Sequence, residues 1–369
     1  MSATRAKNAG ISAARSVQAR SFTMSDQTLQ SRRRFVGTAA ITLAAGHQGL
    51  PSVASARPAS GARGVAQAAA RSFAPLKQIR AGLLDVAYAE DGPADGPVAL
   101  LLHGWPYDIH TYVEVAPLLA AKGYRVIVPH LRGYGSTRFL SDSTPRNGQQ
   151  AVFALDAIAL LDALAIDKAV VAGCDWGART ANIMAAIWPE RCKALVSVSG
   201  YLIGNRDANR QPLPPAAELQ WWYQFYFSTE RGRAGYDVHR REFARLIWQL
   251  ASPKWGFDDR TFERSAASLD NPDHGKIVIH NYRWRLGLAA GEPQFDSLEA
   301  RLALSPAIAV PTITLEGDAN GAPHPAPAAY AAKFSGKYLH RDLTGGIGHN
   351  LPQEAPRQFA AAVIDAAAL

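Results

Sequence analysis

The sequence contains few cysteines and no long apolar run. Only Cys174 and Cys192 occur among its 369 residues. One pair cannot build a disulfide framework, and neither cysteine stands at a metal-ligand spacing. No segment is apolar enough to cross a bilayer as a helix, and no internal repeat is present. We therefore expect neither a disulfide-stapled scaffold nor a cysteine metal site, and no stable membrane insertion of the mature chain.

Positive charge is concentrated at one end of the chain. The formal net charge at pH 7 is +8, but residues 1–56 contain seven Lys or Arg against one Asp. The remainder is therefore close to neutral. Because a basic surface outside this segment is not expected, we predict no nucleic-acid partner.

The same segment has the form of an export signal. Residues 31–36 (SRRRFV) precede a weakly apolar run at residues 37–46 and the small-residue site Ala54-Ser55-Ala56. This arrangement is typical of a cleaved signal, and the arginine pair followed by Phe resembles a twin-arginine signal. We predict an export signal at residues 1–56, a linker at residues 57–75, and a periplasmic or secreted bacterial protein. Met24 is an alternative start.

From residue 81 onward, short apolar runs alternate with helix-like segments, which is typical of a parallel α/β sheet. Expected strands cover residues 83–89, 97–102, 124–129, 168–172, 193–198, 310–315 and 338–343, and expected helices cover residues 111–121, 149–164, 179–188, 325–334 and 356–367. The pattern breaks at residues 205–295, which carry many aromatics and arginines but no strand-like run. We predict a core of residues 76–204 and 296–369 with a helical cap at residues 205–295.

Asp175 lies in the sequence Gly173-Cys174-Asp175-Trp176-Gly177, directly after a strand-like run. Gly-x-Asp-x-Gly has the pattern of a nucleophile elbow, with aspartate in the place of serine. The glycines permit a sharp turn, and the helix that follows favours negative charge at its N-terminus. A carboxylate so placed can attack a carbon electrophile and form an ester with the enzyme. The alternative is an Asp that only caps the helix.

The order of these parts resembles the α/β-hydrolase fold over residues 80–369. A strand, His103-Gly104-x-Pro106, the elbow, the cap, an acid loop and Gly348-His349 before the last helix follow that family's order. The resemblance implies a mostly parallel sheet flanked by helices, with a helical cap inserted after the sixth strand. It also implies that His349 is the catalytic base and that His103 supports the oxyanion loop.

Two positions compete for the acid that orients His349. Many relatives place this acid three residues after a glycine such as Gly317, and that position here is Asn320. Asp318 is the nearest carboxylate, and its spacing from Pro323 is similar to that of soluble epoxide hydrolases. An Asp bonded to the histidine would fix its tautomer. We predict Asp318, with Asn320 or a displaced acid as alternatives.

An aspartate nucleophile indicates attack on a carbon that bears a leaving oxygen or halogen, because acyl transfer would give an anhydride. An opened epoxide needs a positioned proton donor. The segments around Tyr223 and Tyr282 resemble those that carry the donor tyrosines of soluble epoxide hydrolases. Haloacetate dehalogenases instead carry a His-Trp pair in place of Gln224-Phe225 and an arginine in place of Trp176. For each tyrosine alone, core packing is an alternative explanation.

We therefore predict an epoxide hydrolase that forms an alkyl-enzyme ester on Asp175 and releases a vicinal diol. The backbone N–H groups of Trp105 and Trp176 would form the oxyanion hole, and Pro106 would lock the first of these through a cis bond. Trp105, Trp176, Tyr223 and Tyr282 would also contact a small apolar substrate. No cofactor and no metal are expected, and the oligomeric state is not predicted.

Two alternatives stay open at this point. One is a haloalkane or haloacetate dehalogenase that uses the same Asp nucleophile. The other is a non-catalytic small-molecule-binding protein, because a fold does not dictate a function.

Overall fold

The computed structural model describes residues 72–73 and 75–369, so the predicted export signal and most of the predicted linker lie outside the described residues. The described part contains a nine-stranded sheet. Its strands are β1 (Lys77–Ala81), β2 (Leu84–Asp91), β3 (Val98–Leu102), β4 (Arg125–Pro129), β5 (Arg138–Phe139), β6 (Ala169–Gly173), β7 (Cys192–Val198), β8 (Thr312–Gly317) and β9 (Tyr338–Leu343).

The sheet is mostly parallel, in the order β1-β2-β4-β3-β6-β7-β8-β9, with β5 beside β2. Every antiparallel pair involves β2, which runs against β1, β4 and β5 near one edge. In the centre, Leu102 of β3 pairs with Gly173 of β6, so both strands end at the same level. Because the carboxyl ends of parallel strands meet at one edge, His103 and the predicted elbow follow side by side.

Apolar residues on alternate sides of the strands form two cores. Leu100, Leu102 and Val171 pack on the side of α3 (Gln150–Ala163) and α4 (Trp176–Ile187). Leu101 and Val170 pack on the opposite side, with α2 (Val115–Ala120) and α13 (Pro356–Ala368). The central strands are therefore buried on both faces, as their continuous apolar runs predict. Short helices complete this part: η2 (Ile109–Tyr112), η3 (Pro189–Arg191), α11 (Pro327–Tyr330), η7 (Ala331–Lys333) and α12 (Leu351–Glu354).

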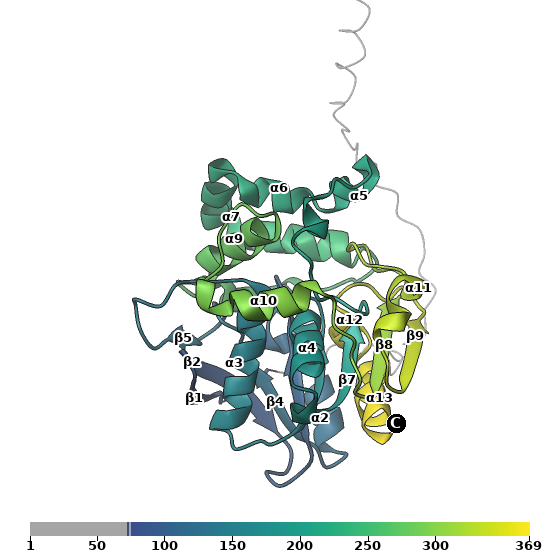
Figure 1. The fold of residues 1–369 in the computed structure, drawn as a ribbon. Helices are drawn as coiled ribbons and strands as arrows, with labels where there is room; N and C mark the ends of the chain where they lie inside the picture. The colour runs from purple at the N-terminus through teal and green to yellow at the C-terminus, as the bar shows by residue number, and fades with distance from the viewer. Residues whose placement is uncertain (1–71, 74) are drawn as a thin grey trace, which may run out of the picture. The chain divides into compact units, whose positions relative to one another are not determined.

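Between β7 and β8 the chain forms helices joined by loops, and the last of these helices begins just after residue 295, where we predicted the cap to end. These are η4 (Ala208–Arg210), α5 (Pro215–Gln220), α6 (Trp222–Ser228), α7 (Glu230–Ala251), α8 (Asp259–Ala266), η5 (Ala267–Asp270), α9 (His274–Arg285), η6 (Pro293–Phe295) and α10 (Asp296–Ala303). Figure 1 shows α5, α6, α7 and α9 gathered beyond one end of the sheet, with α10 beside α3. Rings of the cap pack on one another, for example Phe227 on Tyr236 and Phe243.

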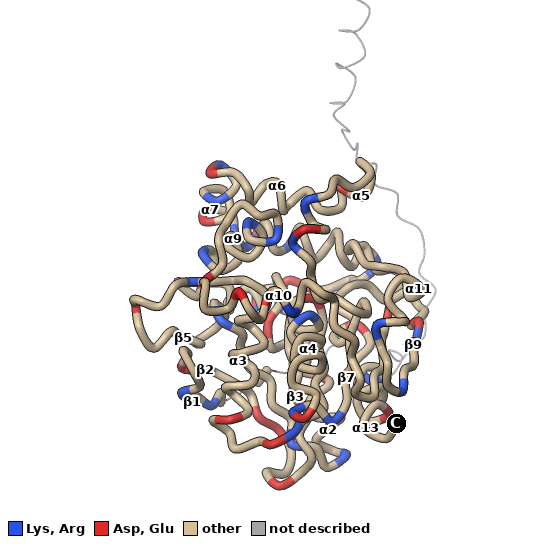
Figure 2. The backbone as a smooth tube through the Cα atoms, in the orientation of Figure 1, with Lys and Arg blue, Asp and Glu red and all other residues tan. Residues whose placement is uncertain are grey.

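The expected fold class is confirmed, with two additions. The edge strand β1 and the two-residue strand β5 were not predicted, and the cap follows the sixth strand when β5 is left out. Figure 2 shows acidic and basic positions interleaved over the sheet and the helices beyond it. In the part of the chain that the structure describes, no helix combines the length and the apolarity needed to cross a bilayer.

Candidate active site

Asp175 occupies a sharp turn between β6 and α4. Its backbone has φ 55° and ψ −119°, a left-handed conformation that is uncommon for a residue with a side chain. Two glycines allow the close packing around it. A Cβ on Gly177 would collide with the carbonyl oxygen of Leu102, and one on Gly104 would collide with the Asp175 side chain. The turn therefore holds the Asp175 carboxylate above the end of the sheet, against the loop that follows β3.

The loop after β3 supplies a hydrogen bond to this carboxylate. The backbone N–H of Trp105 donates to Asp175 Oδ1 at 2.8 Å, and the Trp105–Pro106 peptide bond is cis, as predicted. His103 supports the loop from within. Its Nδ1 lies 3.0 Å from the carbonyl oxygen of Gly104, and its Nε2 accepts the N–H of Leu131 at 3.1 Å. Burial lowers the pKa of His103 to about 4, so the ring is neutral and Nδ1 is the donor.

His349 lies beside the same carboxylate. Its Nε2 is 3.7 Å from Asp175 Oδ2. Burial alone would raise the pKa of Asp175, but the His349 ring, the Arg179 charge and the Trp105 N–H together hold it below its ordinary value. Asp175 is therefore ionised near neutral pH, as a nucleophile must be.

The structure does not bring Asp318 to His349, contrary to our prediction. Asp318 is exposed, and its carboxylate accepts the backbone N–H groups of residues 345, 346 and 347 at 3.1, 2.8 and 2.9 Å. Gly345 and Gly346 both have positive φ, so successive N–H groups point at one anion. These bonds outweigh burial and lower the pKa of Asp318. Asp318 thus holds the loop that precedes His349, rather than its ring.

The alternative position does not supply the acid either. The Asn320 amide donates to Glu316 Oε1 at 2.7 Å and to Ser199 Oγ at 3.3 Å. The Nδ1 of His349 is buried, and no hydrogen-bond partner for it is found among the described residues.

The backbone of His349 is held by two residues that we did not predict. Ser252, which follows α7, accepts the N–H of His349 at 2.9 Å and donates to Glu354 Oε1 at 2.7 Å. Glu354 Oε2 accepts the N–H of Gly348 at 2.7 Å. A Cβ on Gly348 would lie 2.5 Å from Ser252 Oγ, so this contact requires glycine there. Ser252 therefore links the helical cap to the base.

Tyr223 of α6 and Tyr282 of α9 lie together above Trp105. Their ring centroids are 5.3 Å apart, and they lie 5.4 and 5.2 Å from the Trp105 ring. Burial raises the pKa of both phenols above the ordinary value, and the charge of Asp175 raises both further. Both hydroxyls are therefore protonated near neutral pH and lie within the electrostatic field of the carboxylate.

A small cavity separates the carboxylate from the cap. Its volume is about 60 Å³, and Asp175, His349, Trp105 and Tyr223 are among the residues that line it. That volume corresponds to roughly two water molecules. The remaining lining is largely apolar and includes Trp221, Trp222, Ile247 and Leu250. A substrate larger than this volume therefore requires the cap side chains that line the cavity to move.

The Trp105 indole belongs to a buried chain of hydrogen bonds that the sequence did not reveal. Its Nε1–H donates to Tyr236 Oη at 3.0 Å, and Tyr236 Oη lies 2.9 Å from His274 Nε2. His274 Nδ1 lies 2.9 Å from the carbonyl oxygen of Gly133. Burial lowers the pKa of His274 to about 3, so its ring is neutral and each group donates to the next. This chain fixes the indole against which both phenols pack.

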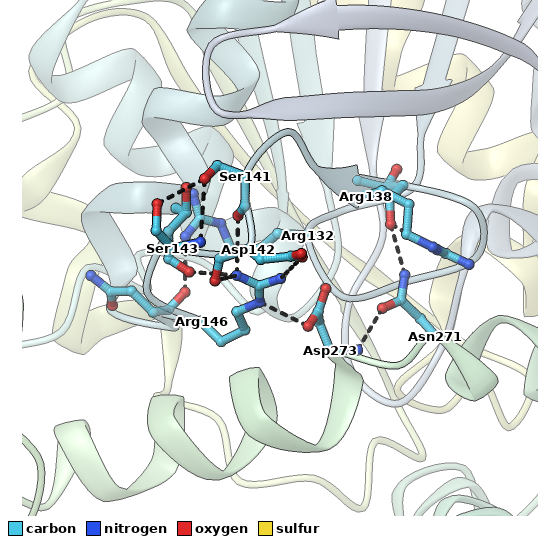
Figure 3. A network of polar contacts seen from close by, with 11 residues as sticks. Arg132, Arg138, Ser141, Asp142, Ser143, Arg146, Asn271 and Asp273 are labelled. Carbon is cyan, nitrogen blue, oxygen red and sulfur yellow. Dashed lines mark hydrogen bonds and ion pairs between the residues drawn. The ribbon is translucent and has the colours of Figure 1, made fainter.

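The start of α9 is tied to the loop of residues 131–147. Figure 3 shows Arg146 reaching Asp273, and Nε to Oδ1 is 2.8 Å. Asn271 donates to the carbonyl oxygens of Thr137 and Gly135 at 2.8 and 3.2 Å. Because α9 carries Tyr282, these bonds fix one donor phenol relative to the sheet.

The structure thus brings Asp175, His349, Trp105, Tyr223 and Tyr282 to one place. Trp176 also lies there, as the first residue of α4. Its indole Nε1 is buried, and no partner for it is found in the described part of the chain. Among the described residues, no cluster of His, Cys, Asp and Glu could hold a metal ion.

Comparison with known proteins finds a matching family profile and relatives of similar sequence. A family profile described as alpha/beta hydrolase fold matches residues 97–237. Over 157 residues the chain is 32% identical to epoxide hydrolase B of Mycobacterium tuberculosis. This match covers 38% of this chain and 43% of the relative. Over 227 residues it is 36% identical to an AB hydrolase superfamily protein of Bacillus subtilis, covering 58% of this chain and 74% of that one. The chain therefore spans less than half of the Mycobacterium relative.

A solved structure shows the same architecture. The crystal structure of a candidate epoxide hydrolase from Klebsiella pneumoniae subsp. pneumoniae is 62% identical in sequence, with a TM-score of 0.80. The match covers 80% of this chain and 98% of that one. An evolved variant of potato epoxide hydrolase is 22% identical with a TM-score of 0.62, and that likeness concerns the fold alone.

Proposed function

The chain belongs to the α/β-hydrolase family, on its epoxide hydrolase-like branch, and we propose that it hydrolyses epoxides to vicinal diols. One observation carries the proposal most. The ionised carboxylate of Asp175 accepts the backbone N–H of Trp105, and the protonated phenols of Tyr223 and Tyr282 pack on the Trp105 ring, so all three groups share one buried site. An epoxide needs a nucleophile at carbon and a proton donor at oxygen, and this arrangement offers both.

The proposed reaction has two steps. In the first, an Asp175 oxygen bonds to an epoxide carbon while the ring C–O bond breaks, and a phenol delivers a proton to the departing oxygen. In the second, His349 takes a proton from water, and the resulting hydroxide adds to the carboxyl carbon of the ester. The tetrahedral intermediate then breaks its bond to the diol oxygen, which takes the proton from His349, and the proton that the Asp175 carboxyl loses restores the phenol through solvent. The Trp105 N–H, which donates to Asp175 Oδ1, would stabilise the oxyanion of that second step. We assign the same role to the Trp176 N–H.

We also propose the export route predicted from the sequence. Residues 1–56 would direct the protein through a twin-arginine route to the periplasm or the medium. Fractionation of expressing cells tests this: the activity should leave the cytoplasm, and replacement of Arg32, Arg33 and Arg34 by lysine should retain it inside.

A paired assay tests the proposed activity. Purified protein is incubated with styrene oxide, and phenylethanediol is measured; the same preparation is incubated with chloroacetate and fluoroacetate, and released halide is measured. Diol without halide supports the proposal. Halide without diol contradicts it, and the absence of both products favours a non-catalytic binding protein.

The second candidate function is dehalogenation, and the Trp176 indole favours its haloalkane form, since haloacetate dehalogenases carry an arginine at this position. A halide leaving group is stabilised by N–H donors, and the indole of Trp176, the residue after Asp175, has a buried N–H with no partner among the described residues. An unpartnered buried donor costs about 1–3 kcal/mol, which a bound halide would offset. Tyr282 fits both reactions, but Tyr223 has no comparable task in dehalogenation, so we place it second.

The donor role of the phenols predicts a large kinetic effect. Tyr223→Phe and Tyr282→Phe should each lower the alkylation rate by about 10²-fold or more, because a positioned acid contributes about 10²–10⁴-fold. Tyr226→Phe is the matched control, since this tyrosine lies on α6 and packs on Trp222 and Phe243. Stopped-flow tryptophan fluorescence measures the step. Rates equal to that of the control in both variants would remove the phenols from the mechanism.

The pKa shifts predict the alkaline side of the pH profile. A proton donor whose pKa is raised keeps its proton to higher pH, so both phenols stay active beyond their ordinary pKa of 10. The alkylation rate should therefore show no loss due to these groups below about pH 10. An alkaline decline centred below pH 9 that shifts in Tyr223→Phe would show that a phenol titrates there, against this prediction.

A further inference from the structure

The cap contains a second, larger hollow that the proposed reaction does not use. This hollow, here called the cap cleft, has a volume of about 460 Å³ and lies between the segment of residues 208–213, α6 and the end of α9. Its size falls within the range of about 300–1,000 Å³ typical of small-molecule sites.

The cap cleft and the catalytic cavity share a wall. Trp221, between α5 and α6, lines both the cleft and the 60 Å³ cavity that contains Asp175 and His349. The Trp221 ring lies 5.8 Å from the ring of Tyr223. The two spaces therefore meet at Trp221, and a molecule seated in the cleft would border the catalytic cavity.

The charge of the cleft lining is positive. It contains the guanidinium groups of Arg210 and Arg285 and the carboxylate of Glu218. Glu218 Oε1 accepts the backbone N–H of Leu213 at 2.8 Å, and neither arginine forms an ion pair with an acidic residue of the described chain. The lining thus carries one net positive charge, which a singly charged anion would balance.

Both arginines are held by packing rather than by acids. The Arg285 guanidinium lies 5.0 Å from the Trp221 ring centroid and 5.7 Å from that of Tyr282. The Arg210 Nε lies 3.0 Å from the position that a Cβ on Gly287 would take, so glycine there leaves room for the guanidinium. Exposed Leu213, Phe225 and Leu288 add apolar surface to the same lining.

We propose that the cap cleft binds the acidic end of the substrate, an aryl epoxide that carries a carboxylate. The carboxylate pairs with Arg210 and Arg285, whose planar guanidinium groups suit carboxylate recognition, and the epoxide ring passes Trp221 to reach Asp175. This inference rests on the proposed function and adds the class of substrate. Apolar contacts in the cleft hold the body of the molecule.

The test compares 4-carboxystyrene oxide with styrene oxide at constant ionic strength. The wild type should favour the carboxylate by about tenfold or more in kcat/KM, the effect of one charge-assisted hydrogen bond. In Arg210→Gln and Arg285→Gln, this ratio should fall toward one through a higher KM for the carboxylate. Arg283→Gln is the control: Arg283 lies on the same helix, pairs with Glu230, and should keep the wild-type ratio.

A binding measurement separates this proposal from the proposed function. Calorimetry with 4-ethylbenzoate and 4-ethylbenzamide needs no turnover. The cleft proposal is supported if the benzoate binds more tightly than the benzamide and Arg210→Gln abolishes this difference. If this is found while neither epoxide is hydrolysed, only the proposed activity is overturned. Equal binding of the two probes, or an unchanged ratio of kcat/KM values in Arg210→Gln, overturns the cleft proposal while styrene oxide hydrolysis still supports the activity.

Discussion

Replacing Asp175 with alanine is expected to lower epoxide turnover by at least about 10⁴-fold, the scale of the loss when a covalent nucleophile is removed. Without the carboxylate, no ester can form, and the remaining groups can only polarise the substrate. The elbow itself should persist, because its backbone is fixed by the close packing of Gly177 on Leu102. Diol formation by the purified variant measures the effect, and its thermal unfolding shows whether the fold is kept.

Asp318→Asn is the matched control for this substitution. Asp318 bonds only to the backbone of residues 345–347 among its hydrogen-bond partners, so its neutral amide should keep far more activity than Asp175→Ala. A loss as large as that of Asp175→Ala would return Asp318 to the catalytic triad.

Replacing His349 with glutamine should stop the reaction halfway. Alkylation of Asp175 needs no base, whereas hydrolysis of the ester needs an activated water. The variant should therefore accumulate an ester, seen in intact-protein mass spectrometry as a mass increase equal to that of the epoxide. Steady-state turnover should fall by about 10³-fold or more.

Peptide mapping should place the added mass on Asp175. His239→Gln, at an exposed position of α7, should show neither the adduct nor the loss of turnover. An inactive His349→Gln protein without adduct would mean that His349 acts before the ester forms, or that no ester forms.

The sequence predicted those parts of the molecule whose structure depends on residues close together in the chain. The apolar run before Gly173 is short and rich in Val, which favours a buried strand, and the glycines around Asp175 permit a sharp turn, so the elbow was located correctly. The same holds for His103 and the cis peptide bond at Pro106. The two-residue strand β5 was missed because so short a strand leaves no pattern.

The parts that were missed depend on contacts between distant segments. Ser252 meets His349 across 97 positions, and Trp105 meets Tyr236 across 131. No local pattern marks such residues, since the packing of the cap on the sheet brings them together. Asp318 shows the converse. Its spacing from Pro323 is similar to that of a catalytic acid, but its carboxylate accepts the N–H groups of two glycines with positive φ, and the spacing alone does not reveal these bonds.

The central claim, that a carboxylate oxygen of Asp175 bonds to substrate carbon, is tested most directly by one turnover in H₂¹⁸O with enzyme in excess over styrene oxide. If the ester forms, water attacks the carboxyl carbon, so the first diol contains only ¹⁶O and the label appears in the peptide that contains Asp175. If water attacks the epoxide directly, the diol carries ¹⁸O and Asp175 stays unlabelled, which would contradict the account.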